Sequence, residues 1–215
     1  MKIKSITFLM IFLTSALVAQ YRTSTIKIGN FNPGATDIGF MIGYESARSV
    51  DRHFDIGWSV DWFHKSYVDQ SLVAEFDNYN GYFNSSLNEL RATTNLHSIP
   101  VLFNMTAKFP MVPRFSYYIT SGIGAEALFI FYRNYENPIE DEFDLAFDFN
   151  WRIGVGIAYQ LGRYSDIVFE LNYHESTPSW TYELNDPRVG RTKILERQFD
   201  MSGFIARIGF KFFYW

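Results

Sequence analysis

Two residues that could carry out nucleophilic chemistry stand close together in NYHESTPSW, residues 172–180. His174 and Ser176 are two positions apart, so both side chains lie on the same face of an extended strand, whereas Glu175 lies on the other. A histidine beside a serine can activate the hydroxyl when an acid orients its ring. Glu183 is one candidate for that acid. Because the pattern does not fix this third member, we interpret the pair as part of a polar rim and predict no catalytic residue.

The groups that could bind a metal ion lack the spacing that metal sites require. His53, His64 and His97 are scattered along the chain, and cysteine is absent. Zinc sites bring several such ligands together at characteristic spacings. The segment ENPIEDEFD, residues 136–144, is rich in carboxylates, but it lacks the spaced ligands and the glycine of a calcium loop. We therefore predict no metal site and no cofactor, and we interpret this acidic segment as a solvated loop.

Charged side chains also recur at alternate positions of otherwise apolar segments. In AFDFNWRIGVGIAYQL, residues 146–161, the odd positions are all apolar or aromatic and the even positions are all small or polar. This period of two is that of a strand with one apolar face. The same phase assigns nine charged residues to the polar faces of the predicted strands: Lys27, Glu45, Asp61, Lys108, Glu126, Arg152, Glu170, Arg207 and Lys211.

Eight segments with this alternation must position the charges. They cover residues 23–31, 36–47, 53–66, 93–109, 115–133, 146–161, 166–178 and 199–214. Their connections alternate in length. The short connections cover residues 46–52, 110–114 and 162–166, and the long ones 67–92, 134–145 and 179–198; only the first connection on the long side, 32–36, is short. Short turns on one side and long loops on the other are typical of transmembrane β-barrels with an even number of strands.

The aromatic residues indicate that the apolar face meets lipid. Phe147, Phe149 and Trp151 gather at one end of segment 146–161 and Tyr159 stands near the other, with aliphatic residues between them. Two aromatic girdles around an apolar band are what a bilayer favours. A soluble barrel would have its apolar residues inside. The sequence therefore predicts an all-β fold, a closed eight-stranded antiparallel up-and-down transmembrane β-barrel.

Both ends of the chain fit an exported barrel. The first residues, MKIKSITFLMIFLTSALVAQ, have two lysines before an apolar run that ends in small residues, which is the pattern of a secretory signal peptide. We predict that residues 1–19 are cleaved and that residues 20–215 form the barrel domain. The chain has 19 basic and 23 acidic residues and a net charge of −4. This charge argues against nucleic acid as a partner.

The signal sequence, the eight alternating segments and the aromatic last strand together resemble the small bacterial outer-membrane β-barrel proteins, the OmpA-like and OmpX-like class. The resemblance implies a location in the bacterial outer membrane, contact with outer-membrane lipid and lipopolysaccharide, and recognition of the last strand by the barrel-assembly machinery. The residues of that assembly signal would be Phe210, Phe212, Tyr214 and Trp215. The His174 and Ser176 pair is similar to lipid A deacylases of the eight-stranded class, although Thr177 and Pro178 depart from their pattern.

The predicted barrel has an interior only wide enough for side chains to fill. Inward charges must therefore pair, because an isolated buried ion is costly. We predict a lumen plugged by a charge network of Asp61, Glu126, Arg152, Glu170 and Arg207, with Glu126 and Arg152 meeting from neighbouring strands. The expected function is that of a non-enzymatic, monomeric anchor or surface-interaction protein, whose long extracellular loops meet an unidentified ligand. The alternatives are a narrow pore for ions or small solutes and, in third place, a lipid A-modifying enzyme.

Overall fold

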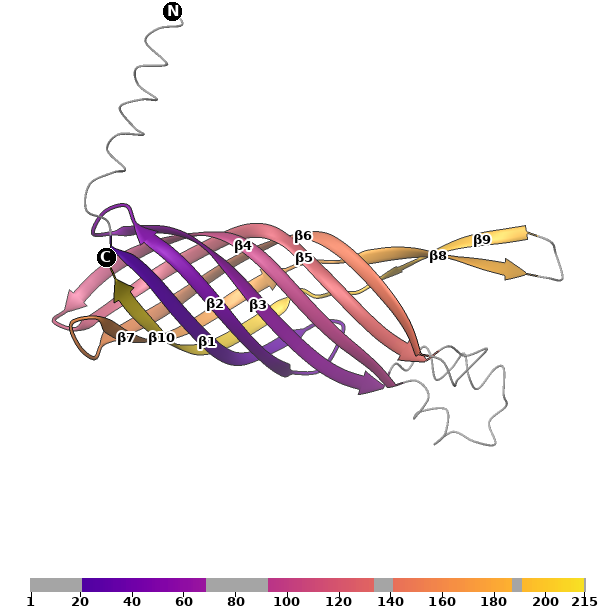
Figure 1. Ribbon diagram of the computed structural model, residues 1–215, viewed down its shortest axis with the longest axis horizontal. Coiled ribbons are helices and arrows are strands. Elements are labelled where there is room, and N and C mark those ends of the chain that lie inside the picture. Colours follow the sequence, from indigo (N-terminus) through magenta and orange to yellow (C-terminus); the bar gives the residue numbers. More distant parts are fainter. Residues whose placement is uncertain (1–20, 69–92, 134–140, 187–190, 215) are drawn as a thin grey trace, which may run out of the picture.

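The computed structural model describes residues 21–68, 93–133, 141–186 and 191–214, which form a barrel of inclined strands with a hairpin extending from one end (Figure 1). The predicted signal peptide, residues 1–19, and Trp215 lie outside the described residues. In the described part of the chain, no helix is long and apolar enough to cross a membrane. The strands are β1 (Arg22–Pro33), β2 (Gly39–Ser49), β3 (Phe54–Val68), β4 (Thr93–Val112), β5 (Phe115–Arg133), β6 (Asp141–Gln160), β7 (Ser165–Glu175), β8 (Ser179–Asp186), β9 (Arg191–Gln198) and β10 (Gly203–Tyr214).

Eight of these strands close into an antiparallel barrel, which confirms the predicted fold. The strand order is β5-β4-β3-β2-β1-β10-β7-β6, and β6 pairs with β5 to complete the circle. Pairing followed once around the wall from Thr23 returns to β1 at Pro33, ten residues farther along. The path runs through Ala47, Gly57, Asn104, Gly122, Arg152, His174 and Gly203. This stagger requires the strands to be tilted against the barrel axis, as barrel closure demands.

The outer wall is apolar, and the polar side chains point inward. On β6, Phe147 and Val155 are 66% and 56% exposed, whereas Asn150 and Arg152 are buried. Successive side chains of a strand point to opposite faces, so exposed and buried residues alternate along it. In a water-soluble protein this surface would be a very large apolar patch. As the wall of a transmembrane barrel, it is the surface that lipid covers.

Local turn chemistry accounts for the short connections. In the turn after β2, the Asp51 carboxylate accepts hydrogen bonds from the backbone N–H groups of His53 (2.6 Å) and Phe54 (2.8 Å). These donors, His53 first, hold the pKa of Asp51 below its ordinary value. Between β4 and β5, Val112 pairs with Phe115 across a two-residue turn, in which Arg114 has a φ of 72°. Two-residue hairpin turns favour positive φ values, because a turn with such values has a backbone twist that matches the twist of the two flanking strands.

Several predicted boundaries were wrong. β4 continues to Val112, so the turn is shorter than the predicted 110–114, and β6 begins at Asp141, so the end of the predicted acidic loop belongs to a strand. β7 and β10 are shorter than segments 166–178 and 199–214. Residues 179–198, predicted as a loop, contain the hairpin of β8 and β9. Among the described residues, β8 pairs with the barrel only at Ser179, opposite Phe147. A strand that lies beyond the lipid-covered wall needs no apolar face. The long alternation of apolar and polar residues that predicted the barrel strands is therefore missing from β8 and β9.

The main apolar cluster lies inside the barrel, at the end that carries the long connections. It is formed by buried side chains from seven barrel strands and from the segment before β10: Phe31, Met41, Phe63, Leu96, Leu128, Ile130, Ala146, Phe199, Met201 and Ile205. The edge of the Phe31 ring meets Phe63, with ring centroids 5.1 Å apart. A smaller cluster of Tyr118, Ala158 and Val168 lies toward the short turns.

Candidate functional site

The middle of the lumen holds a charge network of three carboxylates and three cations. Each comes from a different strand, so the network connects six of the eight barrel strands. Its members, named here the central charge network, are Lys27, Glu45, Asp61, Arg152, Glu170 and Arg207. Their side chains are at most 11% exposed. Because positive and negative groups are equal in number, the network is neutral as a whole.

Asp61 and Glu170 each hold two cations. One oxygen of Asp61 accepts a hydrogen bond from Arg207 Nη1 at 2.8 Å, and the other accepts from Arg152 Nη1. Glu170 accepts from Arg207 Nη2 at 2.5 Å and from Lys27 Nζ at 2.8 Å. Lys27 also donates to Glu45 at 2.6 Å. Shared partners of this kind offset the cost of removing the ions from water.

Neutral donors and small residues complete the surroundings of Glu170 and Asp61. The Tyr118 hydroxyl donates to Glu170 at 3.0 Å, and the Asn172 amide donates at 2.8 Å. Gly43 is opposite Asp61 in the sheet, and a Cβ at Gly43 would collide with the Asp61 carboxylate. The absence of a side chain at Gly43 therefore gives Asp61 the space to reach both arginines.

A separate ion pair closes the lumen toward the short turns. Lys108 Nζ lies 2.6 Å from Asp55 Oδ1, and the Ser49 hydroxyl donates to the same oxygen at 2.6 Å. The ammonium group of Lys211 lies over the Tyr118 ring, 5.8 Å from its centroid. Lys108 and Lys211, two of the three lysines assigned to the inward phase, therefore occupy this end of the lumen, apart from the central charge network.

Glu126 does not join the central charge network, contrary to the expectation that it meets Arg152. In the pairing of β5 with β6, Glu126 is opposite Asp148, whereas Arg152 is opposite Gly122. The two side chains are therefore offset along neighbouring strands. Glu126 instead accepts a hydrogen bond from the Ser98 hydroxyl at 2.6 Å and pairs with His174 Nε2 at 2.8 Å. All three side chains are fully buried.

His174 and Ser176 both point into the barrel, but each has a different partner. His174 contacts Glu126 through Nε2, and the Phe31 ring packs edge-on against the imidazole at 5.6 Å. The Ser176 hydroxyl donates to Asp148 at 3.4 Å. A nucleophilic serine needs its base within hydrogen-bond reach, and no hydrogen bond joins His174 to Ser176 among the described residues. The side chain of Glu183 lies outside the described residues.

Two of the three histidines considered as metal ligands come together on the outer wall. His64 and His97 are opposite each other on β3 and β4, with ring centroids 4.4 Å apart. Trp62 stacks on His97 and donates its indole N–H to His97 Nδ1 at 3.2 Å. The described residues contain no group of three or more side chains that could hold a metal ion. The sequence could not reveal this pairing, because it depends on the register between two strands.

The last strand closes the barrel between β1 and β7. Phe212 and Tyr214 are exposed on the outer wall, and the Phe210 ring lies 4.6 Å from that of Phe212. Ser24 donates to the Tyr214 hydroxyl at 3.1 Å. The proposed role of these residues in assembly stays a prediction.

The barrel is similar to solved structures of bacterial outer-membrane proteins. A major outer-membrane protein from Thermus thermophilus has a TM-score of 0.59 and 12% identity, over 91% of this chain and all (100%) of the other. Neisserial surface protein A has a TM-score of 0.54 and 8% identity, over 90% and 96% of the two chains. OprG from Pseudomonas aeruginosa has a TM-score of 0.54 and 10% identity, over 91% and 95%. No protein-family model and no curated protein matches the sequence.

At this level of identity, the comparisons establish the fold. The apolar outer wall, the charged interior and the short turns at one end follow from the chain's own residues. The predicted resemblance and the predicted location in the bacterial outer membrane are both in keeping with this fold. The chain is thus a small closed eight-stranded antiparallel β-barrel of the kind found in bacterial outer membranes.

Proposed function

We propose that the chain is a non-enzymatic outer-membrane protein that acts as an anchor and presents its outer segments to partners, while its lumen stays closed. The observation that carries this proposal is the central charge network. Six side chains from six strands meet across the lumen, and each carboxylate is satisfied by a cation. A conducting path would have to separate these ion pairs, at a cost of several kcal/mol for each ion left unpaired.

Two further layers support a closed lumen. Toward the long connections, the apolar cluster around Phe31, Phe63 and Met201 fills the interior. Toward the short turns, Tyr118 and Val168 pack together, and the ion pair of Lys108 with Asp55 lies at the same end. An ion crossing the barrel would meet an apolar plug as well as the charges. Such a plug disfavours passage, because an ion loses its hydration there.

The hairpin of β8 and β9 supports a role at the cell surface. It extends beyond the barrel wall at the end with the long connections (Figure 1). In the described residues, β9 pairs only with β8, and β8 meets the barrel only at Ser179. The backbone edges of this hairpin are therefore open to pairing with a partner's strand. We propose a surface protein as the partner class for this hairpin.

Conductance in planar bilayers tests the closed lumen. Refolded protein without residues 1–19 should give no steady channels, whereas a large porin added to the same bilayer serves as the positive control. A triple variant, Asp61→Ala, Arg152→Ala and Arg207→Ala, removes half of the central charge network and tests whether the network is the barrier. Stable, ion-selective channels from the unaltered protein would overturn the proposal in favour of the narrow pore.

The proposal includes two further expectations from the sequence. Residues 1–19 should be absent from the protein purified from membranes, which intact-mass measurement would establish. Lipid A from cells with and without the protein should have the same mass spectrum. A mass change that depends on Ser176 would instead support the lipid A-modifying enzyme.

A further inference from the structure

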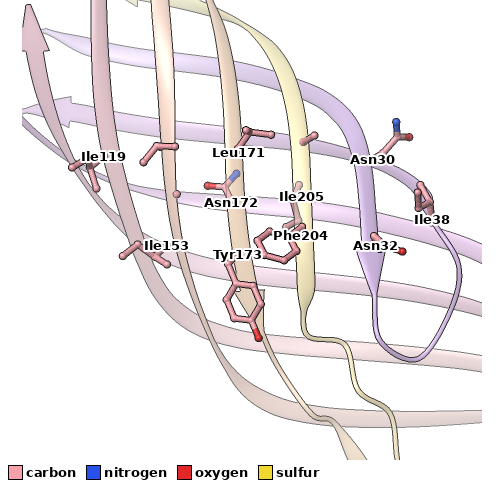
Figure 2. A pocket seen from close by; sticks show the side chains of 13 residues that line it. Asn30, Asn32, Ile38, Ile119, Ile153, Leu171, Asn172, Tyr173, Phe204 and Ile205 are labelled. Carbon is pink, nitrogen blue, oxygen red and sulfur yellow. The ribbon is translucent and has the colours of Figure 1, made fainter.

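A groove of about 660 Å³ lies on the outside of the barrel, where β1, β10, β7, β6 and β5 are adjacent (Figure 2). Its volume is in the range of pockets that hold small ligands. The walls are outward-facing apolar side chains: Ile119, Ile153, Val155, Leu171, Tyr173 and Phe204. Ala206 stands between the larger Phe204 and Ile208 on the same face of β10. Its small side chain leaves the depression open.

One end of the groove lies at a row of aromatic rings. Trp151, Tyr173 and Phe204 follow one another across β6, β7 and β10, with centroid distances of 5.8 Å and 5.3 Å. The Tyr173 hydroxyl donates to Glu175 at 2.6 Å. Aromatic rings with a polar tip gather where lipid chains meet the headgroups. This row is on the side of the long connections, so the groove faces the outer leaflet.

Two amide side chains lie beside the apolar walls. Asn30 and Asn32 are on the exposed face of β1, opposite Ala206 and Phe204 of β10. Neither side chain has a hydrogen-bond partner among the described residues. Where lipid chains meet the headgroups, an amide without a protein partner can donate to and accept from the polar groups of a lipid. The two asparagines therefore favour an occupant that brings its own hydrogen-bonding groups to this level of the membrane.

We propose that the groove binds an acyl chain of one lipopolysaccharide molecule, and that Asn30 and Asn32 hydrogen-bond the groups that link this chain to the sugar. Apolar walls match the chains, and amide side chains match the carbonyl and hydroxyl groups of acyl linkages. The outer leaflet of the outer membrane is where this lipid resides. The site is separate from the lumen, so the proposal does not depend on whether the lumen conducts.

Native mass spectrometry of the refolded protein tests this site. The protein in detergent is offered an equimolar mixture of lipid A and phosphatidylethanolamine, and the bound copies are counted. The unaltered protein should retain one lipid A. Two changes should abolish that preference: Ala206→Leu, which fills the groove, and the pair Asn30→Leu with Asn32→Leu, which removes the amides. The matched controls are Ala125→Leu and Ser121→Leu, exposed positions of β5 that do not line the groove.

Each result decides the proposal. Loss of lipid A from both groove variants, with retention in both controls, supports it. Equal retention of the two lipids by the unaltered protein, or full retention by the groove variants, overturns it. A protein dimer that Ala206→Leu disrupts would also overturn it, because a second copy would then cover the groove. Electrophoretic mobility before and after heating reports folding, and if Ala206→Leu does not fold, the asparagine pair carries the test.

Discussion

At the residue scale, Asp61 is the member of the central charge network that connects the most distant strands. It comes from β3 and binds arginines from β6 and β10. Asp61 is the one carboxylate that Arg152 contacts among the described residues. Arg207, by contrast, also binds Glu170. The two members of this ion pair therefore depend on each other unequally: without Arg152, Asp61 still has Arg207 as a counter-ion, whereas without Asp61, Arg152 has no counter-ion among the described residues.

This asymmetry predicts unequal costs for the two single substitutions. Asp61→Leu leaves Arg152 buried without a counter-ion, so the free energy of unfolding should fall by about 3–5 kcal/mol. Arg152→Met should cost less, because Asp61 keeps Arg207. The double variant should recover part of the loss from Asp61→Leu. Urea unfolding in lipid vesicles, followed by tryptophan fluorescence, measures these values, with Asp37→Asn in the exposed loop 34–38 as the control. Equal costs for both single variants would contradict the pairing.

At the scale of elements, the hairpin of β8 and β9 is nearly independent of the barrel. β10 pairs with β7 along its length, from Gly203 opposite His174 to Phe212 opposite Ser165. The hairpin lies between these two strands in the sequence, and among the described residues β8 is paired with the wall only at Ser179, opposite Phe147. The barrel therefore closes without it.

Replacing residues 180–197 by a short glycine and serine linker should leave the barrel folded. Halving the length of a flexible connection changes its closure free energy by only about 0.6 kcal/mol, so the unfolding midpoint in urea should move little. Binding of any surface partner should be lost. A control that replaces residues 34–38 by a linker of equal length should keep the partner. Failure of the hairpin deletion to fold would show that the hairpin supports the barrel.

At the scale of the whole molecule, the protein has its apolar residues outside and its charges inside. Ile123 is 57% exposed on the outer wall, whereas the neighbouring Gly122 faces the lumen. A charge placed on the lipid face near the middle of the bilayer destabilises a barrel by about 2–4 kcal/mol. Ile123→Arg should therefore lower the unfolding free energy in vesicles by that amount, and Ile123→Val should change it little. If the two variants are equally stable, β5 does not present this face to lipid.

The sequence by itself determined the eight strands of the barrel and the face of each on which a side chain lies, although it missed the hairpin of β8 and β9. These properties are local, because a strand has a period of two wherever it occurs. Eight of the nine charges assigned to the inward phase are buried, and Lys108 is partly buried. The sequence could also predict that they must pair, because eight strands enclose too little space for water around each ion.

Only the tertiary structure decided which charges meet. Glu126 and Arg152 share a phase, but the register of β5 with β6 separates them, and Glu126 pairs with His174 instead. Asp61 reaches Arg152 and Arg207 across the lumen, where sequence separation carries no information. The groove beside Asn30 likewise depends on five strands being adjacent. Pairing and shape depend on register and closure, which involve the whole barrel, whereas the alternation of faces needs only a strand and its immediate neighbours in sequence.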